Sequence, residues 1–168
     1  MPALAAAAIA LTGCGSSSKA SGVQLAPSGG STEAAVTTTA KPPPALSKKP
    51  TVTVPTGPAP THLVTKDLVT GTGQTAKAGD TVTVNYVGVL YKTGKEFDSS
   101  WSRNQPFTTA LSNGSVIPGW VQGIPGMKVG GRRELIIPAS LAYGKAGSPP
   151  TIPPNSPLVF VVDLLSIS

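Results

Sequence analysis

The sequence has few of the residues on which most catalytic and metal sites depend. Its 168 residues include one cysteine, Cys14, and one histidine, His62. A single cysteine excludes a disulfide within the chain. Without a second histidine or a cysteine cluster, we expect no metal site. No strand, glycine-rich loop and helix follow one another in the pattern of a phosphate site. We therefore expect a function that needs no cofactor.

Charged residues are also scarce, at 12% of the chain against about 25% in an average soluble protein. The net charge is +6, but the basic excess is divided between residues 1–60 and 61–168 and never forms a run longer than two. We interpret it as solvated surface and expect no nucleic-acid binding. The basic residues before Thr61 would weakly favour an anionic membrane surface.

Long hydrophobic runs are missing as well. Residues 3–11 form a short apolar run, well below the roughly 20 residues of a membrane-spanning helix. The run is typical of a secretory signal, and it leads into Leu11-Thr12-Gly13-Cys14, which resembles a bacterial lipobox. This pattern predicts a lipoprotein signal peptide over residues 1–13 and acylation of Cys14. The protein would then be extracytoplasmic and anchored by lipid to the bacterial cell membrane. No Lys or Arg precedes the run, so an alanine-rich tail with a chance cysteine remains the alternative.

Residues 14–60 contain few large apolar side chains. Ser, Thr, Ala, Gly and Pro dominate, with Pro42-Pro43-Pro44 as one cluster. Such a segment buries too little apolar surface to offset the entropy of ordering. We predict a disordered linker that follows the lipidated cysteine and holds a folded domain of residues 61–168 clear of a membrane.

Alternating apolar and polar residues predict strands in the remaining part. Residues 81–86 alternate, with Val82, Val84 and Tyr86 on one face. Further strands are expected at 95–98, 107–110, 132–137 and 158–167. The last is apolar on both faces, which favours a central position. One short helix is expected at 118–123, with Pro118 in its first turn. Many strands with one helix indicate an α+β fold.

Aromatic residues make up only 5% of the chain, and most belong to one ordered set of motifs. The set reads Tyr86, Phe97-Asp98-Ser99-Ser100, Arg103, Phe107, Val116-Ile117-Pro118-Gly119-Trp120, Leu141-Ala142-Tyr143-Gly144, Ile152-Pro153-Pro154 and Leu158-Val159-Phe160. In order and spacing it resembles the FKBP-type peptidyl-prolyl cis-trans isomerases, over roughly residues 61–168. The resemblance implies a five- or six-stranded, curved antiparallel sheet wrapped around one short α-helix.

The resemblance also implies roles for single residues. Trp120 would form the floor of a pocket under a proline ring. Asp98 would accept hydrogen bonds, steadied by Tyr86 and Arg103. The Ile117 N–H and the Tyr143 hydroxyl would donate to ligand carbonyls. The predicted catalytic residues are Tyr86, Phe97, Asp98, Tyr143 and Phe160. The predicted substrate-binding residues are Arg103, Phe107, Val116, Ile117, Trp120 and Ile152. Taken singly, most of these aromatic residues would be interpreted as core; their joint order favours a site.

Two positions depart from the family pattern. Ser148 stands where many members carry a histidine, and Ser115 stands where some carry a glutamate. Neither is central to the implied pocket, so they bear on substrate preference.

The implied function is peptidyl-prolyl isomerisation in exported or cell-surface proteins. The expected partners are proline-containing polypeptides, and macrolides of the tacrolimus and rapamycin type. No heptads or interface stripe are present, so we expect a monomer. The alternative is a non-catalytic proline-binding chaperone or surface adhesion module, since binding and twisting would use the same walls.

Overall fold

The structure is a computed structural model that describes residues 44–168. The predicted signal peptide, Cys14 and the predicted linker up to residue 43 lie outside the described residues. Within residues 44–168, no helix combines the length and the apolar character needed to cross a membrane.

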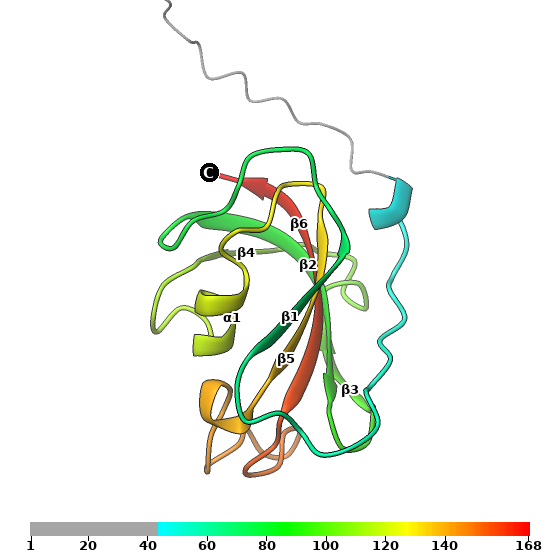
Figure 1. Ribbon diagram of the computed structural model, residues 1–168, viewed down its shortest axis with the longest axis vertical. Helices are drawn as coiled ribbons and strands as arrows, with labels where there is room; N and C mark the ends of the chain where they lie inside the picture. The colour runs from blue at the N-terminus through cyan, green and yellow to red at the C-terminus, as the bar shows by residue number, and fades with distance from the viewer. Residues whose placement is uncertain (1–43) are drawn as a thin grey trace, which may run out of the picture. The chain divides into compact units, whose positions relative to one another are not determined.

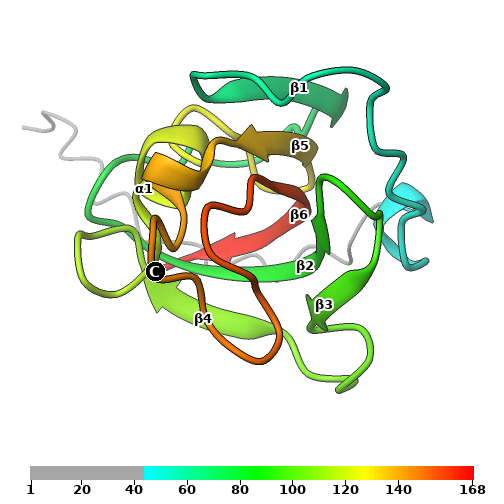
Figure 2. The same ribbon diagram turned by 90° about the horizontal axis from the view of Figure 1, so that it is seen from below.

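Six strands form one antiparallel sheet. They are β1 (Val64–Val69), β2 (Thr81–Leu90), β3 (Glu96–Ser99), β4 (Phe107–Ala110), β5 (Arg132–Ile137) and β6 (Leu158–Ile167). Their order is β1-β5-β6-β2-β3, and β4 also pairs with β2. The helices are α1 (Pro118–Gly123) and the 3₁₀ turns η1 (Pro44–Leu46) and η2 (Ala139–Leu141). The sheet curves around α1 (Figures 1 and 2). The predicted α+β fold is confirmed.

The inner face of the sheet carries the main core. Val82, Val84 and Tyr86 are buried on one face of β2, as their alternation predicted. They join inward residues of β5 and β6 and Trp120 of α1 in one cluster. The helix comes close because Gly119 lacks a side chain: a Cβ there would lie 2.5 Å from Cγ2 of Ile137 on β5. This close packing sets the position of Trp120 against the sheet.

The outer face of the sheet is also apolar. Val87, Val89, Tyr91, Ile136 and Val159 form a second buried cluster there. Residues 44–60, here called the N-terminal strap, cover it through three spaced apolar residues, Val52, Val54 and Ala59. The strap runs along the sheet on the side away from α1 (Figures 1 and 2). The prediction of disorder up to residue 60 is therefore wrong for residues 44–60, because a two-sided apolar sheet offers even a sparse segment a surface to bury.

Polar contacts also fix the strap. The Arg132 guanidinium donates to the Lys48 carbonyl at 2.9 Å. The same guanidinium donates to both carboxylate oxygens of Asp163, at 2.5 and 2.7 Å. Burial raises the pKa of Asp163, and the Arg132 hydrogen bonds oppose that rise. The Tyr91 hydroxyl donates to the Pro58 carbonyl at 3.3 Å. The strap therefore supplies an acceptor to a buried ion pair as well as apolar cover.

Leu46→Ala is expected to lower the free energy of unfolding by about 2 kcal/mol, because Leu46 in η1 is only 2% exposed. This is the low end of the usual range for a buried leucine, since a short 3₁₀ turn outside the sheet can relax into the space left. The measurement is urea unfolding of the full chain, with Thr51→Ala, an exposed strap position, as the control. Equal stability of the two variants would show that the strap does not pack as described.

Candidate active site

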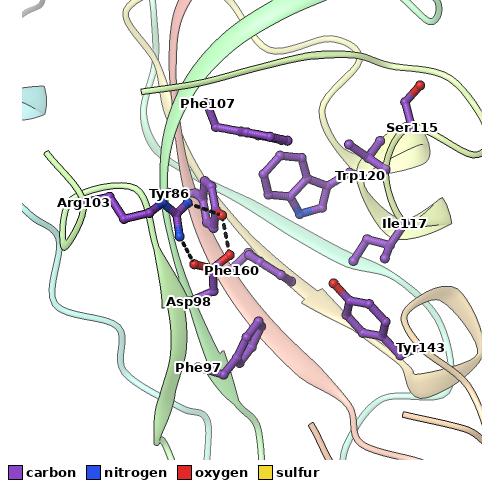
Figure 3. Close-up of a pocket in the computed structure, with 11 residues that line it drawn as sticks. Tyr86, Phe97, Asp98, Arg103, Phe107, Ser115, Ile117, Trp120, Tyr143 and Phe160 are labelled. Atoms are coloured by element: carbon purple, nitrogen blue, oxygen red, sulfur yellow. Dashed lines mark hydrogen bonds and ion pairs between the residues drawn. The ribbon is translucent and has the colours of Figure 1, made fainter. Parts of the chain in front are cut away.

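A pocket of about 330 Å³ opens between α1, the inner face of the sheet and the loop that follows η2. It is lined by Tyr86, Phe97, Asp98, Arg103, Phe107, Ser115, Val116, Ile117, Trp120, Tyr143 and Phe160 (Figure 3). These residues come from four strands, the helix and three loops. The fold thus gathers at one place most of the residues that the sequence motifs single out.

Three packed aromatic rings form the base of the pocket. Trp120 of α1 lies edge-on to Phe160 of β6, with ring centroids 5.4 Å apart, and edge-on to Tyr86 of β2 at 5.2 Å. Each of the three residues is less than 7% exposed. Edge-to-face contacts of this kind are favourable and hold the rings at defined angles. The base is therefore apolar and preorganised.

The walls are aromatic but more open. Phe97 of β3 lies edge-on to Phe160 at 5.5 Å, and Phe107 of β4 lies edge-on to Tyr86 at 6.0 Å. Phe107 and Tyr143 are 37% and 40% exposed, and they stand on different sides of the pocket (Figure 3). Exposed aromatic rings around a concave apolar base are typical of a binding site for an apolar group.

Gly88 makes room for two of these rings. A Cβ at Gly88 would lie 2.7 Å from Cζ of Phe97 and 2.8 Å from Cε1 of Phe160. The predicted site residues do not include Gly88, although an isolated glycine inside a strand indicates that another group approaches the strand closely. Gly88 is thus a site residue that contributes by having no side chain.

One carboxylate lies at the edge of the aromatic pocket. The Tyr86 hydroxyl donates to Oδ2 of Asp98 at 2.5 Å, and Arg103 pairs with Oδ1 of the same carboxylate. Arg103 also donates to the Tyr86 hydroxyl at 2.8 Å, and the Ser99 N–H donates to Asp98 at 2.8 Å. The contacts among the three side chains are drawn in Figure 3. Asp98 is therefore held in one orientation from several sides.

Both tyrosines of the pocket keep their protons at neutral pH. Burial, and next the hydrogen bond to Asp98, raise the pKa of Tyr86 to about 12, although Arg103 works in the opposite direction. Burial also raises the pKa of Tyr143, with a smaller contribution from the Asp98 charge. Each phenol is therefore a hydrogen-bond donor across the physiological range.

We expect kcat/KM to stay constant from pH 7 to pH 10, because Tyr86 remains protonated with a pKa of about 12. The raised folded-state pKa also means that Tyr86 favours folding below pH 10, its ordinary value, and that this contribution is lost between pH 10 and 12. A pH profile of the wild type and of Tyr86→Phe checks this. A fall in wild-type activity centred below pH 10, absent from Tyr86→Phe, would contradict it.

The positions of Ile152 and Ser115 differ from those that the sequence motifs predicted. Ile152 does not line the pocket; it is buried in the inner cluster, 4% exposed, and its carbonyl accepts a hydrogen bond from the Ser148 N–H. Ser115, noted only as a departure from the family pattern, does line the pocket, and its hydroxyl hydrogen-bonds that of Ser112 at 3.0 Å.

Residues 44–168 hold no group of three or more His, Cys, Asp or Glu side chains placed to bind a metal ion. The pocket offers one carboxylate, one guanidinium, the hydroxyls of Tyr86, Ser115 and Tyr143, and many aromatic carbons. Such a lining suits an uncharged, largely apolar group that also carries a few hydrogen-bonding atoms.

Comparison with known proteins identifies the family. The family model described as "FKBP-type peptidyl-prolyl cis-trans isomerase" matches residues 72–165. The chain is 53% identical over 121 residues to the "FK506-binding protein" of Streptomyces anulatus, which covers 71% of this chain and 98% of that protein. It is 50% identical over 107 residues to the "FKBP-type peptidyl-prolyl cis-trans isomerase FkpA" of Escherichia coli K12, covering 64% of this chain and 38% of that protein.

Solved structures agree with the fold. The crystal structure of FkpA from Escherichia coli superimposes with a TM-score of 0.58 at 50% identity, over 63% of this chain and 48% of that one. The crystal structure of AtFKBP13 gives a TM-score of 0.60 at 40% identity, over 66% of this chain and 96% of that one. The chain belongs to the FKBP-type peptidyl-prolyl cis-trans isomerases.

Proposed function

We propose that the pocket of Figure 3 is where this isomerase binds a prolyl residue and assists rotation about the X-Pro bond. The observation that carries the proposal is the preorganised aromatic base, bordered by one oriented carboxylate, in a chain of this family. Phe97, Asp98, Tyr86, Tyr143 and Phe160 are the catalytic residues in this account.

The reaction needs no nucleophile. Resonance gives a peptide C–N bond a rotational barrier of about 18–20 kcal/mol, and X-Pro bonds isomerise in tens to hundreds of seconds unaided. No covalent bond breaks, so catalysis requires a site that binds the twisted amide better than the planar one. A twisted amide has lost resonance and its carbonyl is less polar. An apolar pocket from which water is displaced therefore favours it.

The surrounding residues would bind and orient the peptide. Trp120 would lie under the proline ring, with Phe107, Val116 and Ile117 beside it. The protonated Tyr143 hydroxyl and the Ile117 N–H would donate to peptide carbonyls. Arg103 would act by holding Asp98 and the Tyr86 hydroxyl in place.

A refolding assay tests the proposal. The full chain should accelerate the refolding of a protein whose slow step is isomerisation to a native cis proline, and tacrolimus should abolish the acceleration by occupying the pocket. Tacrolimus binding without acceleration would instead support the non-catalytic proline-binding alternative. If the protein showed no tacrolimus binding and no acceleration, the pocket would be ruled out as the site.

We further propose that the protein acts outside the cytoplasm as a monomer on a lipid anchor at Cys14. The support is the sequence alone, Leu11-Thr12-Gly13-Cys14 after an apolar run. Expression in bacteria with labelled palmitate should label the wild-type chain and leave Cys14→Ser unlabelled. Equal labelling, or none in either protein, would refute the anchor.

A further inference from the structure

The part of the chain that brings Phe97, Asp98 and Arg103 to the pocket has little sheet support of its own. β3 is four residues long and lies at the end of the strand order, paired only with β2 among the strands. Its pairing with β2 is interrupted by a register shift between Gly88 and Val89. Arg103 follows β3 in an irregular loop, residues 100–106. Edge strands and irregular loops belong to the less stable parts of a fold.

One strap residue contacts both halves of this segment. Lys49 Nζ lies 2.7 Å from Oε2 of Glu96 and 3.4 Å from Oγ of Ser102. The Ser102 hydroxyl in turn donates to Oε1 of Glu96 at 3.0 Å. Glu96 immediately precedes Phe97, and Ser102 immediately precedes Arg103. The ammonium of Lys49 therefore links the start of β3 to the loop beyond it.

Apolar packing links the strap to the same loop. Trp101 packs against the outer cluster, which the strap residues Val52 and Val54 also cover. On the other side, the loop is tied to β2, because the Ser100 hydroxyl accepts from the Tyr86 N–H at 2.9 Å and donates to Asn85 at 3.0 Å. The loop that carries Arg103 is thus held between β2 and the strap.

We propose that the N-terminal strap positions the active site, and that Lys49 is a positioning residue that acts through Glu96 and Ser102 on Phe97, Asp98 and Arg103. The inference rests on the proposed function of the pocket. The family model matches from residue 72 onward, so the strap lies outside the part of the chain that the family model covers.

The expected effect is moderate and depends on salt. The side chains of Lys49 and Glu96 are 42% and 35% exposed, and exposed ion pairs contribute little and are screened by salt. At low ionic strength, Lys49→Ala should lower kcat/KM by about threefold. The loss should come from a lower kcat more than from a higher KM, because the substitution leaves the base of the pocket unchanged. Wild-type activity should approach that of the variant at high salt.

The adjacent lysine provides a matched control. Lys48 is exposed, and within residues 44–168 its hydrogen bond to Arg132 is made by the backbone carbonyl and not by the side chain. Lys48→Ala therefore removes the same charge from the same segment and should retain wild-type activity. Lys49→Arg, which keeps the charge and the reach, should also retain it. All variants are made in the full chain, and their melting temperatures should agree within about 2 °C, as expected for surface changes in a domain of this size.

Two outcomes overturn the inference: equal kcat/KM for Lys49→Ala and Lys48→Ala, or a loss that Lys49→Arg does not restore. Hydrogen exchange tests the effect of Lys49 on β3 independently of catalysis. Lys49→Ala should speed exchange of the β3 amides relative to Lys48→Ala and leave β5 unchanged. If the wild type proved inactive, the proposed function would fail, and unchanged β3 exchange would separately refute the strap's role.

Discussion

Asp98→Ala is expected to lower kcat/KM for an X-Pro peptide by about tenfold, from the loss of hydrogen bonds to a charged acceptor. The substitution removes the acceptor of the Tyr86 hydroxyl and the partner of Arg103. A larger loss is not expected, because the Asp98 side chain is 39% exposed and solvent screens its pair with Arg103. The measurement is a peptide isomerisation assay with the full chain.

Asp67→Ala is the matched control for this variant. Asp67 is a half-exposed carboxylate paired with Arg133, with Nε to Oδ1 at 2.6 Å, and it does not line the pocket. Both substitutions remove one negative charge and one ion pair. If the two variants were equally active, Asp98 would have no special role in the site, and the assignment of this residue would be withdrawn.

Gly88→Ala is expected to reduce kcat/KM by tenfold or more and to lower the free energy of unfolding by about 1–3 kcal/mol, the usual cost of overpacking. The new methyl group would lie within 3 Å of both the Phe97 and the Phe160 rings. These two rings must move or rotate, and both line the pocket. The edge-to-face contact between them, at 5.5 Å, would then be lost.

Gly123→Ala separates the effect on the pocket from the effect on stability. A Cβ at Gly123 would lie 2.8 Å from Cδ2 of Leu135, which is a clash of similar severity in the core. Gly123 and Leu135 do not line the pocket. Gly123→Ala should therefore destabilise the protein and keep most of its activity. Similar activity losses in the two variants would mean that general destabilisation, and not the displaced rings, explains the result.

The pattern of apolar and polar residues was sufficient to predict the helix and several strands of this fold. The helix at 118–123 and the strands at 107–110, 132–137 and 158–167 lie where the sequence predicted them. The alternating residues 81–86 form only the first part of β2, which continues to Leu90. The alternation breaks at Tyr86-Val87, because Val87 and Val89 face the second cluster on the outer side. A strand part that is buried on both faces does not alternate, so periodicity alone indicates only the first part of β2.

The strap could not be predicted from its own composition. Its buried residue Leu46 and its covering residues Val52, Val54 and Ala59 are separated by polar and proline residues, as in a linker. Their burial depends on the outer face of a sheet whose strands come later in the chain. Such contacts are distant in sequence, and only the folded sheet determines them.

In the candidate site, too, some features could be predicted from the sequence and others could not. The aromatic residues could be identified because their motifs occur in a family order, and the structure brings Tyr86, Phe97, Phe107, Trp120, Tyr143 and Phe160 around one cavity. The steric role of Gly88 and the burial of Ile152 in the inner cluster depend on contacts in three dimensions. The motifs therefore predicted most of the residues that line the pocket, but not how its walls are held.

The role of the aromatic pocket in isomerisation is tested most directly by exchange spectroscopy of an X-Pro peptide with an apolar X, with the full chain present in catalytic amounts. We expect faster cis–trans exchange, loss of the acceleration on addition of one equivalent of tacrolimus, and reduced acceleration in Asp98→Ala. Acceleration that persists with tacrolimus bound, or that is unchanged in Asp98→Ala and Gly88→Ala alike, would contradict the claim that this aromatic pocket is the site of isomerisation.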